Sequence, residues 1–171
     1  ILPKSVTSLG ARAFDGCTSL QTVTYAGTIT DWMTVAIADE YATPMRYASN
    51  ITLAGSSVSS LDFSDAKIFT QPVTSVPDFC FYGWDSLSAV TIPAQLTQLG
   101  TGAFSACGRL KNFIVDDANQ VFEANYIVHN TGTEDEYRTY GGLLRSKTSS
   151  AIIACGGGYP LHYYYGYTRY N

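Results

Sequence analysis

The stretch Ile92–Val115 reads IPAQLTQLGTGAFSACGRLKNFIV, and its pattern occurs twice more upstream in the chain. The three copies align without gaps. The interval from Phe81 to Phe104 is one period, and the interval from Phe14 to Phe81 is almost three times as long. A period of this length indicates that each copy is one structural unit that buries its apolar face against its neighbours. The aligned apolar columns are Leu2, Phe69 and Ile92; Val6, Val73 and Leu96; Leu9, Val76 and Leu99; Ala13, Cys80 and Ala103; Phe14, Phe81 and Phe104; Cys17, Trp84 and Cys107; Leu20, Leu87 and Leu110; and Val23, Val90 and Phe113.

The spacing between the first and second copies therefore exceeds one period, and the extra residues would hold close to two further repeats. Within these extra residues Val58–Phe63 preserves the strand pattern of Leu20–Tyr25. We therefore interpret residues 26–68 as degenerate repeat material carrying an insertion. Ile51–Val58 is typical of a hairpin with Gly-Ser-Ser at its tip. Trp32 is interpreted as a packing anchor of the insertion, with stacking on a ligand as the alternative.

The residues of the repeat are typical of one class of repeat. The first copy contains Leu-Pro, Val-Thr-Ser-Leu-Gly, Ala-Phe-Asp-Gly-Cys-Thr-Ser-Leu and Val-Thr-Tyr in that order. This resembles the BspA-like, or Treponema pallidum-type, leucine-rich repeats, from which the second copy departs at Pro77 and Trp84. The resemblance implies an α/β repeat fold. We expect a leucine-rich-repeat solenoid of short parallel strands and helical or 3-10 turns, the first of them at Gly10–Phe14, with a C-terminal β-hairpin region.

The domain organisation follows from the positions of the copies. We expect one leucine-rich-repeat domain over residues 1–171, with regular repeats at about 1–25 and 69–115, the degenerate segment at 26–68, and a β-hairpin region and tail at 116–171. In this last region Val121–Val128 and Tyr137–Ile153 are expected to be strands, the second folding back at Ser-Lys-Thr-Ser-Ser. Residues 156–171 are rich in tyrosine, which is compatible with an aromatic binding patch or with an ordinary chain end. Because the first residue already lies inside a repeat, the chain is expected to be part of a longer protein.

Composition argues against several classes of function. The chain has 10 Lys and Arg residues against 14 Asp and Glu residues, and the basic ones are scattered, so nucleic acid is not an expected partner. No apolar run is long enough for membrane insertion by this segment. The histidines, His129 and His162, lie outside the repeats and belong to no nucleophile or metalloprotease motif. We expect no enzymatic activity, no catalytic residues and no cofactor.

The cysteines and acidic residues predict neither a disulfide nor a metal site. Cys17 and Cys107 share a column but are separated by several repeats, too far for a disulfide. Cys80 falls in a small buried column, so free cysteines acting as small core residues are expected, with Cys155 the least defined. Asp116, Asp117, Glu134, Asp135 and Glu136 form no EF-hand spacing, and we interpret them as solvated turns.

A binding face follows from strand alternation. In the strand of each copy, the residues that flank the central apolar position should project away from the core on one face of a short parallel sheet, which we expect to be concave. These candidate ligand-binding residues are Thr22, Thr24, Ala89, Thr91, Asn112 and Ile114.

The resemblance to BspA-like proteins implies a non-catalytic interaction module, extracellular or at the cell surface of a bacterium. Such a module would mediate adhesion or contacts with host matrix or bacterial surface proteins. The alternative is a glycan-binding or structural spacer module of a larger secreted protein. Aromatic residues aligned on an exposed face would favour glycan, and a lining of small residues without them would favour protein contact or a spacer.

Overall fold

The computed structural model describes residues 1–130, 137–149 and 152–155. The loop that contains Glu134, Asp135 and Glu136 lies outside the described residues, as does the tyrosine-rich segment 156–171 with His162. The elements are β1 (Ser8–Leu9), β2 (Thr22–Tyr25), α1 (Ile29–Trp32), β3 (Ala36–Ile37), a 3-10 helix (Pro44–Arg46), β4 (Asn50–Leu53), β5 (Ser56–Ser57), β6 (Ser60–Asp62), β7 (Ser75–Val76), β8 (Ala89–Ile92), β9 (Gln98–Leu99), β10 (Asn112–Val115), β11 (Phe122–Asn130), β12 (Tyr137–Ser146) and β13 (Ile152–Cys155).

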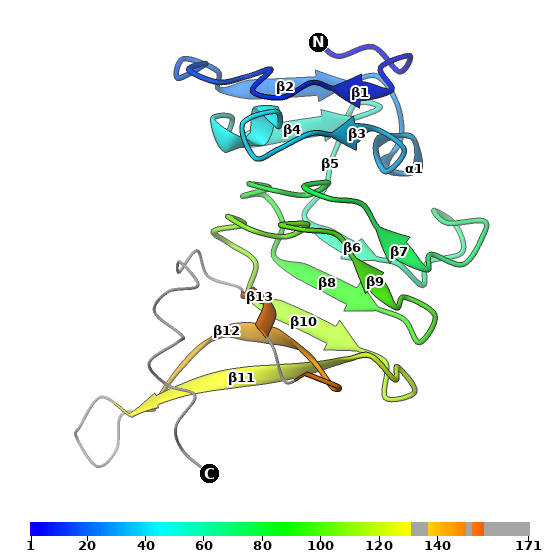
Figure 1. Cartoon of the computed structure of the whole chain (residues 1–171), viewed down its shortest axis with the longest axis vertical. Coiled ribbons are helices and arrows are strands. Elements are labelled where there is room, and N and C mark those ends of the chain that lie inside the picture. The colour runs from blue at the N-terminus through cyan, green and yellow to red at the C-terminus, as the bar shows by residue number, and fades with distance from the viewer. Residues whose placement is uncertain (131–136, 150–151, 156–171) are drawn as a thin grey trace.

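The chain winds in coils, each running from a short strand through a turn to a longer strand (Figure 1). We call β1–β2 the first coil, β3–β4 the second, β7–β8 the third and β9–β10 the fourth. The longer strands pair in parallel as β2–β4 and as β6–β8–β10, and the short strands pair in parallel as β1–β3 and β7–β9. Strands expected at Leu20–Tyr25 and Val58–Phe63 are confirmed by β2 and β6. Strand β6 has no short strand of its own among the described residues, because β5 folds back antiparallel on β4 just before it.

The turn of each regular coil forms no helix, so of the helical or 3-10 turn expected at Gly10–Phe14 only the 3-10 spacing of the hydrogen bonds is found. Its hydrogen bonds join residues three apart, as from the Ala13 amide to the Gly10 carbonyl. Two positions four residues apart then take left-handed backbone, which a right-handed helix excludes. They are occupied by Arg12 and Gly16, Phe79 and Gly83, and Gly102 and Ala106, all with φ between 53° and 74°. The hairpin tip is likewise Ala54–Gly55 rather than Gly-Ser-Ser, with φ of 46° and 81°.

Helices occur in the second coil and the segment that leads into it. The helix α1 begins at a capping box, in which the Thr28 hydroxyl accepts from the Asp31 amide and the Asp31 carboxylate accepts from the Thr28 amide at 2.8 Å. The Asp31 carboxylate accepts from the backbone amide and side chain of Thr28 and from Lys4, which lowers its pKa to about 2. Thr43 caps the 3-10 helix with its side chain, and Pro44 occupies the first helical position.

The core is a column of side chains from successive coils. The rings of Phe81 and Phe104 are stacked with centroids 5.4 Å apart, and both are buried, as predicted. Phe14 is only half-buried, and the second coil places Ala42 where the others place Phe, since the Phe14 amide donates to the Tyr41 carbonyl. The expectation that each copy buries its whole apolar column is therefore wrong for Phe14. Ala13, Cys17 and Leu20 of the first coil are likewise more exposed than their counterparts in the third and fourth coils, whereas Leu9 is buried.

The two ladders of long strands meet at a seam, which we define as the boundary between residues 1–57 and residues 58–155. No strand pair and no backbone hydrogen bond among the described residues crosses it. Trp32 crosses it instead. Its indole Nε1 donates to the Cys80 carbonyl at 2.7 Å, and its ring lies 6.0 Å from that of Trp84. Trp32 has no exposed surface, which confirms its interpretation as a packing anchor.

The last coil is followed by the antiparallel sheet β11–β12–β13. Buried Asn119 joins the two: its amide donates to the carbonyls of Pro93 and Leu96, and its oxygen accepts from the amides of Val121 and Phe122. All four hydrogen bonds of one side chain are thus used to fix the turn that leads from the fourth coil into β11. The strands expected at Val121–Val128 and within Tyr137–Ile153 are confirmed.

Truncating buried Phe104 should cost more stability than truncating half-buried Phe14. We expect Phe104→Ala to lower the free energy of unfolding by about 3–5 kcal/mol, the usual range for a buried aromatic side chain. Phe14→Ala should lower it by roughly half as much, because half-buried Phe14 loses less contact. Urea denaturation of both variants measures this, and equal losses would contradict the burial difference.

A second matched pair tests the seam. Gly16 and Gly83 share a column and have φ of 74° and 73°, but a Cβ on Gly16 meets nothing within 4 Å, whereas one on Gly83 would lie 2.4 Å from the Met45 carbonyl oxygen. Gly16→Ala should cost only the left-handed strain, ~1–2 kcal/mol. Gly83→Ala should cost ~1–3 kcal/mol more, because the backbones must separate. Thermal and urea unfolding of the two variants would refute this if the losses were the same.

Candidate functional site

The predicted binding residues lie on two ladders of one face, the strand face. Ala89 and Asn112 are in register with each other and with Ser60 of β6. Thr91 and Ile114 are in register in the same way, together with Asp62. The structure therefore brings four of the six predicted residues together. Thr22 and Thr24 lie on the other ladder, beside Asn50 and Thr52 of β4.

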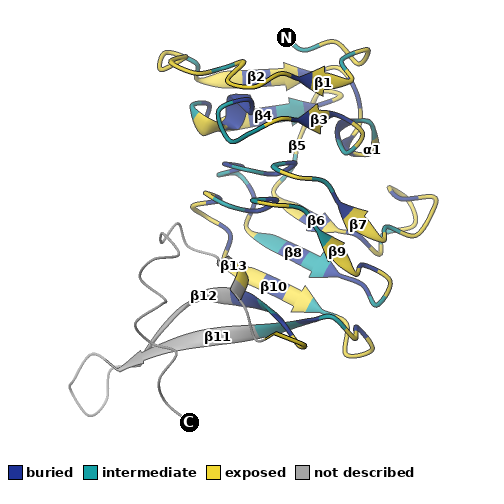
Figure 2. Ribbon diagram, in the orientation of Figure 1, coloured by how far each residue is buried: buried dark blue, intermediate teal, exposed yellow. Residues whose placement is uncertain are grey.

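Alternation along the strands gives this face its character. The intervening residues Val23, Val90 and Phe113 are buried, whereas the residues of the strand face are exposed or half-buried (Figure 2). Ile114 is 56 % exposed, and Asp62 carries the charge in the β6–β8–β10 part. The Thr52 hydroxyl donates to the Thr24 hydroxyl at 3.4 Å. The face thus offers small polar groups and one large apolar side chain, without Trp, Tyr or Arg.

Asn50, Thr52, Ser60 and Asp62 were not among the predicted residues. The strand pattern of Val58–Phe63 was the signal for Ser60 and Asp62, because it marks Leu61 as inward and its neighbours as outward. Asn50 and Thr52 carried no such signal, because the second coil does not keep the regular period. Its Thr52 lies 28 positions after the paired Thr24. Equivalent positions of the regular copies, such as Asp85 and Gly108, are 23 apart.

A second surface, which the sequence did not predict, lies on the turns. We call Arg12, Tyr41, Arg46, Tyr47 and Tyr82 the turn-edge cluster. The Arg46 guanidinium lies over the Tyr41 ring at 4.0 Å, and the Arg12 guanidinium lies 4.9 Å from the same ring. Arg46 Nη1 donates to the Tyr82 hydroxyl at 3.1 Å. The cluster therefore runs across three successive turns and joins the two sides of the seam.

The hydroxyl groups of this cluster are also fixed. The Tyr47 hydroxyl accepts from the Gly16 amide at 3.0 Å and donates to the Asp15 carboxylate at 3.3 Å. Burial raises the pKa of Tyr82, and the Arg46 charge only partly opposes this, so the Tyr82 hydroxyl keeps its proton at neutral pH. Arg12 is paired with Asp15 in a contact that uses two of its nitrogens. Arg46 has no carboxylate partner among the described residues.

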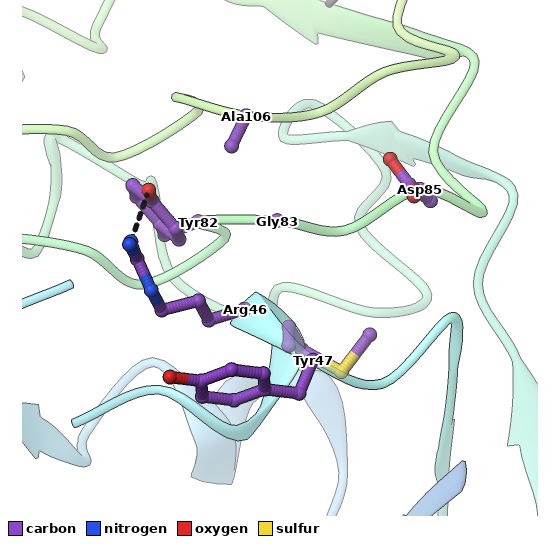
Figure 3. A pocket seen from close by; sticks show the side chains of 7 residues that line it. Arg46, Tyr47, Tyr82, Gly83, Asp85 and Ala106 are labelled. Carbon is purple, nitrogen blue, oxygen red and sulfur yellow. Dashed lines mark hydrogen bonds between the residues drawn. The ribbon is translucent and has the colours of Figure 1, made fainter. Parts of the chain in front are cut away.

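Next to this cluster the surface is hollowed, with a volume of about 360 Å³. Figure 3 shows Arg46 and Tyr82 on one side of the hollow, Tyr47 below and Asp85 on the opposite side. Gly83 and Ala106 complete the lining with Met45. Asp85 Oδ1 accepts from the Gly108 amide at 2.8 Å, which fixes the carboxylate in place. The lining thus places the Arg46 cation and the Asp85 carboxylate at opposite ends.

Two sequence features explain why this surface was missed. Tyr41, Arg46 and Tyr47 belong to the degenerate segment 26–68, where no column identifies outward residues. Tyr82 does lie in a repeat, in a column that holds Asp15 in the first copy and Ser105 in the third. The residue after each aligned phenylalanine differs from copy to copy, and this variation was the signal that could have marked Tyr82 as a surface residue.

The cysteines behave differently at equivalent positions. Cys80 and Cys107 are free and buried, as predicted. Burial raises the pKa of both thiols, that of Cys107 to about 12. Cys17 is free but exposed, so its predicted role as a core residue is wrong. It lies in the first coil, between β1 and β2, and Cys155 lies in β13.

The described residues show neither a cluster of metal ligands nor a membrane-spanning helix. Within residues 1–130, 137–149 and 152–155, no three His, Cys, Asp or Glu side chains are grouped as metal ligands. His129 belongs to β11. The helices in these ranges are too short and insufficiently apolar to span a bilayer.

Short parallel strands that recur with turns and buried phenylalanine columns define a repeat protein with an exposed strand face. Comparison with known families matches residues 1–64 and 59–131 to the family described as "BspA type Leucine rich repeat region (6 copies)". The chain therefore belongs to the BspA-type leucine-rich repeat family. The two matched segments overlap at residues 59–64, which contain β6. Searches of curated proteins and of solved structures gave no match.

Thiol labelling separates the three cysteines. In a Cys155→Ser background, we expect a disulfide reagent to modify Cys17 within minutes at pH 8. Cys80 and Cys107 should react only as the chain unfolds, because their thiols are buried and their pKa values are raised. Mass spectrometry of the labelled peptides measures this. Rapid modification of Cys107 in the folded protein would contradict its place in the core.

Proposed function

We propose that this chain is a non-catalytic interaction module of a bacterial cell-surface or secreted protein, forming a segment of a leucine-rich-repeat solenoid. It binds a protein partner through the strand face. The observation that carries the proposal is the parallel register of β6, β8 and β10, which sets Ser60, Ala89 and Asn112 in one row and Asp62, Thr91 and Ile114 in the next.

The chemistry of this face suits a flat partner surface. Its side chains are small, so a partner backbone can approach closely, and exposed Ile114 supplies an apolar contact. Tight interfaces depend on buried Trp, Tyr and Arg anchors, which this face does not have. A single module therefore binds weakly, and repeated modules of one protein gain affinity through multivalency. Adhesion to host matrix proteins or to other bacterial cells is a function of this kind.

The strand face is tested with the double variant Thr91→Arg and Ile114→Arg, which places two long charged side chains on adjacent strands. The protein is displayed in many copies on beads and bound to a panel of immobilised matrix proteins and whole bacterial cells. We expect the double variant to reduce retention at least tenfold, because the charges and bulk prevent close approach.

The control is Thr97→Arg, an exposed position just before β9, on the opposite side of the coil from β10. It adds the same kind of side chain away from the strand face and should leave retention unchanged. Circular dichroism and thermal unfolding verify the fold of each variant. Equal retention of the folded double variant and the unsubstituted chain would refute the strand face as the binding surface.

A further inference from the structure

The hollow on the turn edge brings a cation, a carboxylate and two tyrosines together, and none of its lining residues belongs to the strand face. We propose that it binds a uronic acid unit of an acidic glycan, that is, a pyranose sugar that carries a carboxylate. This is a second binding activity, distinct from the protein contact proposed for the strand face. Three observations carry it: a preorganised cation, a fixed carboxylate opposite it, and two tyrosine rings on the side of the cation.

Arg46 is the group that recognises the ligand carboxylate. Stacking on Tyr41 and the hydrogen bond to Tyr82 hold its guanidinium in place at the rim of the hollow. A guanidinium that is already fixed loses little side-chain entropy when it binds. The Tyr82 hydroxyl accepts from one N–H group of the Arg46 guanidinium. The other N–H groups remain for a bidentate contact with the ligand carboxylate. Arg12, its neighbour over Tyr41, is already paired with Asp15.

Asp85 recognises the hydroxyl groups of the same ligand. Its Oδ1 accepts from the Gly108 amide, and no described residue donates to its other oxygen. A carboxylate accepts hydrogen bonds only, so the second oxygen of half-buried Asp85 can accept from a sugar hydroxyl. A uronate offers several adjacent hydroxyl donors beside its carboxylate, whereas an acidic peptide offers single backbone N–H groups, so a glutamate peptide is the comparison ligand in the test below. A phosphate dianion would be repelled more strongly than a single carboxylate.

The shape of the hollow agrees with a sugar. Its volume of about 360 Å³ lies at the small end of the range of ligand sites, ~300–1,000 Å³. The floor at Gly83 is backbone without a side chain, since a Cβ there would collide with the Met45 carbonyl. Tyr47 and Tyr82 combine an apolar ring with a polar tip, and both hydroxyls are tied to the protein. The rings thus remain in position to pack against the C–H groups of a pyranose.

The binding experiment is a titration of the ¹⁵N-labelled chain with trigalacturonate, followed by amide chemical shifts. We expect shifts at residues 45–47, 82–85 and 106, and binding at least tenfold tighter than that of the neutral galactotriose. Arg46→Gln should weaken binding at least tenfold. Asp85→Asn should weaken it severalfold, because the amide oxygen can still accept from Gly108 while the second oxygen is replaced by an NH2 group that cannot accept from a sugar hydroxyl.

Two further variants make the result decisive. Tyr82→Phe keeps the ring and releases Arg46, so it should also weaken binding while leaving the fold intact. Arg109→Gln removes an exposed arginine that does not line the hollow and should leave binding unchanged. Any of three outcomes would overturn the proposal: no shifts at the hollow with 10 mM trigalacturonate, equal binding of galactotriose, or equal binding of a polyglutamate peptide.

Discussion

The hydrogen bond from Trp32 to the Cys80 carbonyl is the contact on which the continuity of this protein depends. The parallel ladders stop on either side of the seam, and in the described part of the chain the hydrogen bonds across it come from side chains. Besides Trp32, the Arg46 to Tyr82 hydrogen bond and the close approach of Met45 and Gly83 join the halves. A buried indole is suited to this role for two reasons. Its ring fills the space between the two ladders, and its N–H donates to the Cys80 carbonyl, which accepts no hydrogen bond from any strand that the structure describes.

The same interruption explains the unpredicted surface. Because β5 turns back on β4 and β6 follows it without a short strand, the turn of the second coil meets the turn of the third directly. This contact places Arg46 against Tyr82 and leaves a hollow above Gly83. In an uninterrupted stack the corresponding turns are joined by backbone hydrogen bonds, as between Phe81 and Ala103. The irregularity of the repeat therefore creates the place where side chains of different turns converge.

Sequence reasoning succeeded where a property repeats. The columns of Phe81 and Phe104, of Val90 and Phe113, and the strands that hold them follow from the period of the regular copies. It failed for Phe14, because the second coil supplies Ala42 in place of a ring at that column, and for Cys17, which is exposed although it shares the column of buried Cys107. It also failed for Tyr41 and Arg46, since the length of segment 26–68 does not reveal which turns come into contact across the seam.

Inward and outward columns carry different information in a repeat protein. The regular copies keep phenylalanine at Phe14, Phe81 and Phe104, and the rings of Phe81 and Phe104 stack in the core, whereas the second coil has Ala42 there. The adjacent outward column holds Asp15, Tyr82 and Ser105, whose contacts differ, since Asp15 pairs with Arg12 whereas Tyr82 holds Arg46. Packing does not restrict such positions, so they can change without loss of the fold. Recognition chemistry in this protein is therefore expected in the columns that vary, beside a core column that the regular copies keep.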